Sequence, residues 1–489
     1  MVGGCVRDTI MENPPAGGPK DWDVATNAKP EEIMKIFPDS VYENEFGTVG
    51  IKVRNEVMLP PLRPADTSPQ AGEEVKVVEV TTYRIESKYS DKRHPDEVKF
   101  AKTLEDDLSR RDFTINAMAV KIANGKRTEA NESKYEIIDP FSGQDDLKKR
   151  IIRAVGEADD RFNEDALRMM RAIRFAVQLG FGIEKKTFAA IKKNAKNLKY
   201  ISKERIKDEF EKIILSPNPA GGIKLLYESS LLFEFIPEMK KSVGMEQGFH
   251  HYDGPYRFVF DHLVASLEKC PSEKLEVRLA CLLHDIGKPA TKGGSGKATT
   301  FYNHQYAGAK IARGILWRLR FSKDIIDKTV LLVKNHMFYH NVDEVGEAGV
   351  RRVVRSVGLE NINDLIDVRI GDRLGSGVAK AVPYKLRHFK YMVEKVSKDA
   401  ISVKQLKING NDLIKKIGIK PGPMIGAILD LLLAEVVENP KLNNKKNLVK
   451  LALELSKKDL VNLRSIAKAR IEEEQKKDDQ RMKEKYYVK

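Results

Sequence analysis

The chain has 489 residues, 41% hydrophobic and 32% charged, and its 86 lysines and arginines against 71 aspartates and glutamates give a net charge of +15. This length is too great for a single hydrophobic core and predicts two to four domains. The basic excess suits a polyanionic partner, although charge alone fits simple solubility equally well. Neither a membrane-spanning run nor a signal peptide is recognisable, and the three cysteines show no disulfide or metal spacing, so we predict a cytoplasmic protein without a membrane partner.

The first motifs carry the parts of a nucleotide site. Asp21 and Asp23 stand two residues apart, so on a strand both carboxylates point to one face, where they repel each other unless divalent cations lie between them. Gly4 has no side chain, so the backbone there can approach a triphosphate closely, and Arg7 can bind the phosphate oxygens. We therefore predict Mg²⁺ at Asp21 and Asp23. A solvated loop or a helix cap is the alternative for such an Asp-x-Asp pair.

Residues 1–122 alternate β-branched runs with helical stretches, which predicts an α+β head. The runs are Val49–Val53, Val75–Thr82 and Phe113–Val120. Between the first two, residues 55–74 are rich in proline and polar residues and predict a loop insertion. Glu79 lies within the second run and is the candidate for a third catalytic carboxylate, with a solvated edge-strand glutamate as the alternative.

From Asp139 onward the periodicity is helical, and residues 123–245 predict a helical neck and body that includes Ile206–Leu215 and Gly222–Phe235. The helix that carries the motif EDALRMMRAIRF is expected to bury its apolar members, which are Leu167, Met170, Ile173, Phe175 and Val177. Asp165 and Arg168 of this motif stand at i and i+3, which predicts one helix face.

Asp165 can accept from the exocyclic amino group that cytosine and adenine share, and Arg168 can donate to the ring acceptors of a base. Arg171 and Arg174 continue this face and are available for phosphate or base. An ordinary salt bridge between Asp165 and Arg168 is the alternative.

Residues 246–400 contain most of the histidines. His262, the pair His284 and Asp285, and Asp372 follow the order of HD phosphohydrolases, which predicts a nitrogen and oxygen site for Mn²⁺, Ni²⁺, Fe or Mg²⁺. His304 and His336 stand where a second metal would find ligands, and such a centre can activate water against a phosphoester. The alternative is a domain kept for folding or RNA binding. The structural histidines of this region are expected to be His250, His251, His340 and His388.

Residues 401–489 predict a helical tail with a turn at Gly418–Pro423 and a solvated, charged helix from Arg464.

The order of GGCVRD, DWDVAT, EFGTVGI, VVEVTTYR, RRDFTINAMA and EDALRMMRAIRF resembles the bacterial tRNA nucleotidyltransferase/poly(A) polymerase family, specifically its class II CCA-adding members, here with an HD domain. The resemblance implies a polymerase-β-like head followed by an all-α neck, body, HD domain and tail. It implies addition of CCA to tRNA lacking its 3′ CCA, from CTP and ATP, by two-metal nucleotidyl transfer without a nucleic-acid template. It also implies that Gly4, Arg7 and Arg111 contact the triphosphate and that Asp112 and Asn116 contact ribose or phosphate.

Two local features bear on this resemblance. The segment Tyr89–Pro95 resembles the flexible loop of CCA-adding members and favours completion with A. In the family a helix and a strand precede the glycine pair, whereas only Met1 and Val2 do so here, which predicts a misassigned start or a fragment.

Three other functions remain open from the sequence. The chain could be an A-adding enzyme or a poly(A) polymerase of the same family. The HD domain could carry the main activity beside an inert head. A non-catalytic RNA-binding protein is the third, against which the retained Asp21, Asp23, His284 and Asp285 argue. The sequence does not determine the oligomeric state.

Overall fold

The computed structural model describes residues 1–11, 22–44, 47–54, 75–87, 97–122, 135–247, 257–338, 341–342, 344–378, 380–398, 406–438 and 440–488. These form two compact units, one of residues 1–334 with 371–377 and one of residues 335–370 with 378–489. Outside the described residues lie Asp21, the insertion 55–74, Tyr89–Pro95, His250, His251 and His340. In the part of the chain that is described, no helix is both long and apolar enough to cross a bilayer.

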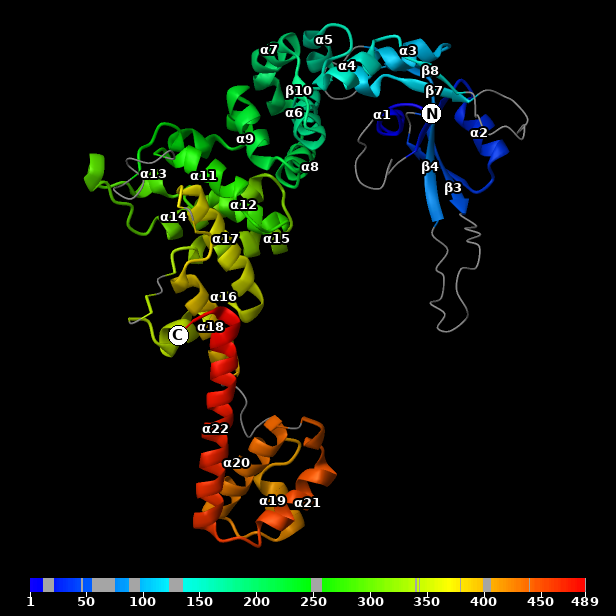
Figure 1. The fold of residues 1–489 in the computed structure, drawn as a ribbon. Coiled ribbons are helices and arrows are strands. Elements are labelled where there is room, and N and C mark those ends of the chain that lie inside the picture. The colour runs from blue at the N-terminus through cyan, green and yellow to red at the C-terminus, as the bar shows by residue number, and fades with distance from the viewer. Residues whose placement is uncertain are drawn as a thin grey trace. The chain divides into compact units, whose positions relative to one another are not determined.

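The first unit begins with a small mixed sheet of strand order β1-β4-β3-β2 (Figure 1). Its strands are β1 (Asp23–Thr26), β2 (Ser40–Asn44), β3 (Thr48–Arg54) and β4 (Val75–Thr82). β1 runs parallel to β4, and the other pairs are antiparallel. Val49 of β3 and Val80 of β4 are buried together with Ile33 of helix α2 (Pro30–Ile36), so this helix covers one face of the sheet. The opposite face is left for polar side chains.

The other helices and strands up to residue 138 are short. They are α1 (Gly4–Ile10), β5 (Arg84–Ser87), β6 (Glu97–Phe100), α3 (Leu104–Ser109), β7 (Ala119–Ile122) and β8 (Tyr135–Ile138). β5 pairs with β6 and β7 pairs with β8, each antiparallel.

Two of the three predicted strands are confirmed to within one residue, but Phe113–Val120 is not a single strand. Thr114–Asn116 form a 3-10 turn, and β7 begins only at Ala119. The Asp112 carboxylate accepts a hydrogen bond from the Phe113 amide, and the Thr114 hydroxyl donates to Asp146. Such side-chain bonds compete with strand pairing. The run is apolar because it is buried throughout, not because it is extended.

Helices make up nearly all the rest of the first unit. They are α4 (Gly143–Lys149), α5 (Ala158–Glu164), α6 (Leu167–Leu179), α7 (Lys185–Asn194), α8 (Lys203–Ile214), α9 (Pro219–Glu228), α10 (Leu231–Phe235), α11 (Val259–Glu268), α12 (Leu275–Leu283), α13 (Lys288–Thr291), α14 (His304–Arg318) and α15 (Lys323–Asn335), with the two-residue strands β9 (Ile151–Ile152) and β10 (Gly182–Ile183) pairing in parallel. The predicted helix Gly222–Phe235 is wrong in one respect. Ser230 has a φ of 68°, a left-handed conformation that separates α9 from α10.

The helix α6 carries the predicted apolar face, and this prediction is confirmed. Its members Leu167, Met170, Ile173, Phe175 and Val177 are all buried. The helix α8 packs against α6 and also buries its apolar side chains. The polar side chains of both helices are thereby held in fixed positions.

The second unit is helical. Its elements are α16 (Glu347–Val357), most of α17 (Ile362–Gly375), α18 (Tyr384–Lys398), α19 (Gly410–Ile417), α20 (Pro423–Glu438), α21 (Lys445–Leu455) and α22 (Leu460–Tyr486). Figure 1 shows α20 lying along the long α22. Asn409 caps α19 and Gly418, with a φ of 79°, ends it, so the predicted turn before α20 is confirmed. Leu413, Ile428 and Leu448 are fully buried in the core of this helical group.

Candidate active site

Asp23 and Glu79 lie side by side on the sheet. They are register partners on the parallel strands β1 and β4, so their side chains point to the same face. Because β4 lies between β1 and β3, the edge-strand alternative for Glu79 is wrong, although its side chain is exposed. Two carboxylates on an accessible face form the kind of oxygen donor set that Mg²⁺ prefers, so these residues fit the predicted ion. Asp21 lies outside the described residues.

The chain preceding α1 is fixed beside these carboxylates. The Val2 amide donates to the Asp23 carbonyl and the Gly3 amide donates to Met118. Gly3 has a φ of 79° and a ψ of −137°, which side chains rarely adopt. A Cβ at Gly3 would lie 2.5 Å from Arg111 Nη1 and 3.5 Å from Asp23 Oδ2. The bare backbone of Gly3 thus occupies the narrow space between a guanidinium and a carboxylate.

Arg110 and Arg111 share one buried partner. Arg110 Nη2 lies 2.7 Å from Asp107 Oδ1, and Arg111 Nη2 lies 3.3 Å from Asp107 Oδ2. Burial alone would raise the pKa of Asp107, but the two guanidiniums outweigh burial and lower it. Arg110 therefore balances a buried acid, whereas Arg111 also extends its Nη1 toward Gly3.

Three arginines surround the ring of Phe175. The guanidinium carbons of Arg7, Arg171 and Arg174 lie 5.3, 5.4 and 4.3 Å from its centroid. Arg7 comes from α1, next to Gly4, and the other two come from α6. Cation–π attraction to the Phe175 ring offsets part of the repulsion among the three guanidiniums. The result is a positively charged surface suited to a polyphosphate.

Asp112 and Asn116 connect these arginines. Arg171 Nε donates to Asp112 Oδ2 at 2.7 Å, Asn116 Nδ2 donates to Asp112 Oδ1 at 3.1 Å, and Arg7 Nη1 donates to Asn116 Oδ1 at 2.8 Å. Burial would raise the pKa of Asp112, but Arg171 and Asn116 outweigh it and lower the pKa to about 2. Both residues are buried. They hold the arginines in position, and their direct contact with a nucleotide stays a prediction.

Asp165 and Arg168 are not on one helix face, so that prediction is wrong. Asp165 follows α5 with extended backbone, and α6 begins two residues later. Asp165 Oδ1 accepts from the Leu167 amide at 3.0 Å, because a short acidic side chain caps a helix start better than it continues one.

The predicted alternative, a salt bridge between Asp165 and Arg168, is replaced by other pairs. Arg168 Nη1 donates to Glu164 Oε2 at 2.6 Å and its Nη2 donates to the Arg110 carbonyl at 3.0 Å. Asp165 Oδ2 instead accepts from Arg205 Nη2 at 2.7 Å. Both residues stand at the junction of α5 and α6.

Two residues of this neighbourhood were not predicted from the sequence, Arg205 and Glu209 of α8. Arg205 holds Asp165, and Glu209 Oε2 lies 3.1 Å from Arg174 Nε. Both lie outside the six motifs named above. The one signal is that Arg205 lies in the first turn of α8, where the helix dipole disfavours a cation.

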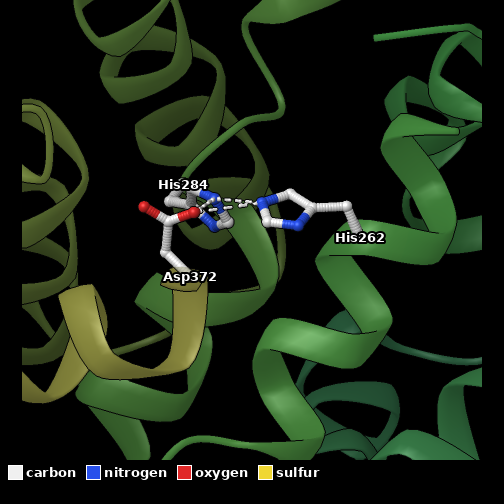
Figure 2. Close-up of side chains that lie close together, drawn as sticks. All are labelled: His262, His284 and Asp372. Carbon is white, nitrogen blue, oxygen red and sulfur yellow. Dashed lines mark hydrogen bonds and ion pairs between the residues drawn. The ribbon is translucent and has the colours of Figure 1, made fainter. Parts of the chain in front are cut away.

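A second polar centre lies in the same unit (Figure 2). His262 comes from α11, His284 directly follows α12, and Asp372 comes from α17. His262 Nε2 lies 3.1 Å from His284 Nε2 and 3.3 Å from Asp372 Oδ1, and His284 Nε2 lies 3.7 Å from Asp372 Oδ1. Asp285 Oδ2 lies 3.2 Å from His284 Nε2. The four predicted ligands are therefore brought together.

The chemistry of this cluster fits a metal ion. Two ligand atoms each about 2.1 Å from one metal lie roughly 3.0–3.5 Å apart, close to the spacings among His262, His284 and Asp372. His284 Nδ1 lies 2.8 Å from the Cys281 carbonyl, which requires the proton on Nδ1 and leaves the Nε2 lone pair for a ligand. Burial alone would raise the pKa of Asp285, but His284 and Lys288 hold it well below its usual range.

His304 joins this centre through a close helix approach. Its Nε2 lies 3.1 Å from Asp285 Oδ1. A Cβ on Gly287 would lie 2.2 Å from the His304 carbonyl and 2.4 Å from the Gly308 amide, so glycine is required for α14 to come this near. Lys288 Nζ contacts Asp285 Oδ2 at 2.5 Å. His336 follows α15 and belongs to the second unit.

Comparisons with known proteins identify the family. The chain matches three domain families: the "Poly A polymerase head domain" over residues 1–153, the "Probable RNA and SrmB- binding site of polymerase A" over 180–242 and the "tRNA nucleotidyltransferase domain 2 putative" over 301–452. It is 31% identical over 450 residues to the CCA-adding enzyme of Streptococcus thermophilus, covering 92% of this chain and 91% of that protein. The chain belongs to the family of CCA-adding enzymes.

Two further members of the family support this assignment. The CCA-adding enzyme of Bacillus cytotoxicus is 44% identical over 242 residues, which are 50% of this chain and 52% of that enzyme. The crystal structure of the Bacillus stearothermophilus CCA-adding enzyme in complex with CTP aligns with a TM-score of 0.54 at 27% identity, covering 93% of this chain and 92% of that one. The predicted family, its nucleotidyltransferase class and the α+β fold with a helical remainder are thereby confirmed.

Proposed function

We propose that the protein adds C, C and A to the 3′ end of tRNA, using CTP and ATP as substrates. The observation that carries the proposal is the juxtaposition of Asp23 and Glu79 with Gly3 and Arg111, on a chain that belongs to the CCA-adding family. The CTP complex of the Bacillus stearothermophilus enzyme supports the choice of nucleotide. The net charge of +15 suits an RNA substrate.

The residues divide the work of nucleotidyl transfer. Asp23 and Glu79, with Asp21 from outside the described residues, would hold Mg²⁺, which supplies charge neutralisation for the reacting oxygens when bound. Arg111 and the backbone at Gly3 and Gly4 would receive the triphosphate. The arginines around Phe175 would neutralise its remaining charge and orient it for in-line attack by the RNA 3′-hydroxyl.

Base selection is proposed for Asp165 and Arg168. A carboxylate accepts a hydrogen bond from the amino group that cytosine and adenine carry, and uracil and guanine lack a donor at that position. Arg168, oriented by Glu164 and the Arg110 carbonyl, would donate to the base. This pair favours selection of both C and A over synthesis of A alone by an A-adding enzyme or a poly(A) polymerase.

The test is incorporation of labelled CMP and AMP into tRNA lacking its 3′ CCA by the full chain. The wild-type protein should incorporate both, whereas Asp23→Asn should lose incorporation while retaining affinity for tRNA. Glu31→Gln, on the covering helix α2, is the matched carboxylate control. Near-normal incorporation by Asp23→Asn would contradict the assignment.

A second candidate function is favoured by the histidine-aspartate centre. We propose that His262, His284, Asp285 and Asp372 bind Mn²⁺, Ni²⁺, Fe or Mg²⁺, with His304 and His336 as candidates for a second ion, and that this centre hydrolyses phosphoesters. The supporting observation is the spacing of the donor atoms, together with the hydrogen bond that places the His284 proton on Nδ1 and so makes Nε2 the ligand atom.

The division of the chain and its setting are also proposals. We propose a head at 1–122, a neck and body at 123–245, an HD domain at 246–400 and a tail at 401–489. A cytoplasmic setting is supported by the three cysteines, Cys5, Cys270 and Cys281, which are thiols rather than disulfides in the structure.

A further inference from the structure

We propose that Arg205 is a positioning residue for base selection, which acts by fixing the orientation of the Asp165 carboxylate. This inference rests on the proposed function, since it assigns to α8 a role in choosing the nucleotide.

Both oxygens of Asp165 are held, and by different elements. Oδ1 accepts from the Leu167 amide at 3.0 Å at the start of α6. Oδ2 accepts from Arg205 Nη2 at 2.7 Å, and Arg205 Nη1 lies 3.5 Å from Oδ1. One bond alone would let the carboxylate rotate about its terminal torsion, which has broad preferences. Two bonds from two helices fix its plane.

The held carboxylate still has room for a ligand. Its two oxygens offer about four lone-pair positions. The Leu167 amide and the two Arg205 nitrogens occupy three of them, which leaves about one for a ligand. The Asp165 side chain is 16% exposed and the Arg205 side chain 31% exposed, so the pair is reachable from solvent. A base amino group can therefore bind to Asp165 without displacing Arg205.

The location of Arg205 indicates that this contact has a purpose beyond helix stability. It lies in the first turn of α8, where the partial positive charge of the helix end disfavours a cation. One turn later, Glu209 of the same helix forms an ion pair with Arg174, one of the three arginines around Phe175. One side of α8 thus supports both the base-selecting acid and a proposed phosphate-binding arginine.

An arginine at this position also has a property that lysine lacks. Its planar guanidinium contacts both carboxylate oxygens and sets the carboxylate plane, whereas an ammonium supplies charge without that orientation. The role therefore predicts graded behaviour, with Arg205→Lys retaining part of the selectivity and Arg205→Met losing it.

The experiment measures kcat and KM for CTP and for UTP with the full chain and tRNA lacking its 3′ CCA. We expect Arg205→Met to lower the ratio of CTP to UTP efficiency by about tenfold and Arg205→Lys by less. Lys212→Met removes an exposed cation two turns further along the same side of α8 and should leave the ratio unchanged. In an Asp165→Ala background, Arg205→Met should cause no additional fall, because the residue acts through Asp165.

The outcomes separate this inference from the function on which it rests. Equal losses with CTP and UTP in Arg205→Met, or an additional fall beside Asp165→Ala, would overturn the positioning role while base selection by Asp165 stands. An unchanged ratio in Asp165→Ala would instead overturn base selection and the positioning role with it. If Arg205→Met does not fold, the ratio measured for Arg205→Lys against Lys212→Met decides, and an unchanged ratio there overturns the inference.

Discussion

Substitution of Gly3 by alanine should disable the proposed transfer site without unfolding the protein. The φ of 79° and ψ of −137° at Gly3 lie in a region that is nearly exclusive to glycine, and a non-glycine residue there costs about 1–3 kcal/mol. The new Cβ would also lie 2.5 Å from Arg111 Nη1, where ordinary contact begins at 3.4 Å.

The size of the effect follows from where Arg111 could move. Relieving the overlap requires a shift of about 1 Å, the difference between 3.4 and 2.5 Å. Arg111 is held by Asp107 at 3.3 Å and faces the Asn116 carbonyl at 3.5 Å, so such a shift disturbs both contacts. Because a misplacement of 1 Å can reduce a reaction about a hundredfold, we expect a loss of that order in kcat/KM for CTP.

The assay compares incorporation of CMP by Gly3→Ala with that by Gly244→Ala. Gly244 has a similar φ of 66°, yet a Cβ there would meet nothing within 4 Å, so this control carries the backbone strain without the collision. Both variants should fold, with a small loss of thermal stability. Near-normal kcat/KM in Gly3→Ala, or an equal loss in Gly244→Ala, would show that a collision with Arg111 does not limit the transfer reaction.

Since the folded-state pKa of Asp112 is lowered from 3.8 to about 2, its ionised form contributes about 2 kcal/mol of stability above pH 4 that is lost as the pH falls toward 2. Asp112→Asn should therefore unfold at a lower temperature than wild type near pH 6, with a gap that narrows below pH 4, and a gap that stays constant to pH 2 would contradict this. His284→Ala should lose its bound transition metal, measured by elemental analysis, and any hydrolysis of 2′,3′-cyclic nucleotides, measured with Mn²⁺ or Ni²⁺ added, while nucleotide incorporation continues. His388→Ala is the control. Wild-type protein that contains no metal would argue against the metal centre. Affinity for tRNA should fall with salt with a slope of about −0.7 to −0.9 per phosphate contact, and a flat titration would mean that the net charge of +15 serves solubility alone.

Much of the fold was predictable where one signal dominates. The β-branched run Val75–Thr82 forms a strand, and the apolar positions of α6 are buried, because alternation and helical periodicity each reflect burial on one face. The prediction of one strand over Phe113–Val120 was wrong because a run that is buried on all sides shows no periodicity. The hydrogen bonds of the Asp112 carboxylate and the Thr114 hydroxyl favour a turn there instead.

The candidate site was predictable in its residues more than in its geometry. The paired carboxylates and the His-Asp pattern can be recognised from residue type and spacing. The register of Asp23 with Glu79 agrees with the prediction that these two carboxylates share one site. The capping role of Asp165 and its bond to Arg205 depend on where a helix starts and which helix packs beside it. Neither is encoded in local spacing, so neither could be predicted from the motif alone.

The composition of the tRNA 3′ end after reaction tests the central proposal most directly. The wild-type protein is incubated either with tRNA lacking its CCA or with tRNA that ends in CC. Each tRNA receives CTP, ATP, both together, UTP or GTP, and the products are sequenced. The proposed function predicts two added C residues with CTP alone, CCA with both nucleotides, and no addition from UTP or GTP. A run of A residues from ATP alone, or the addition of a single A only to tRNA that already ends in CC, would contradict it.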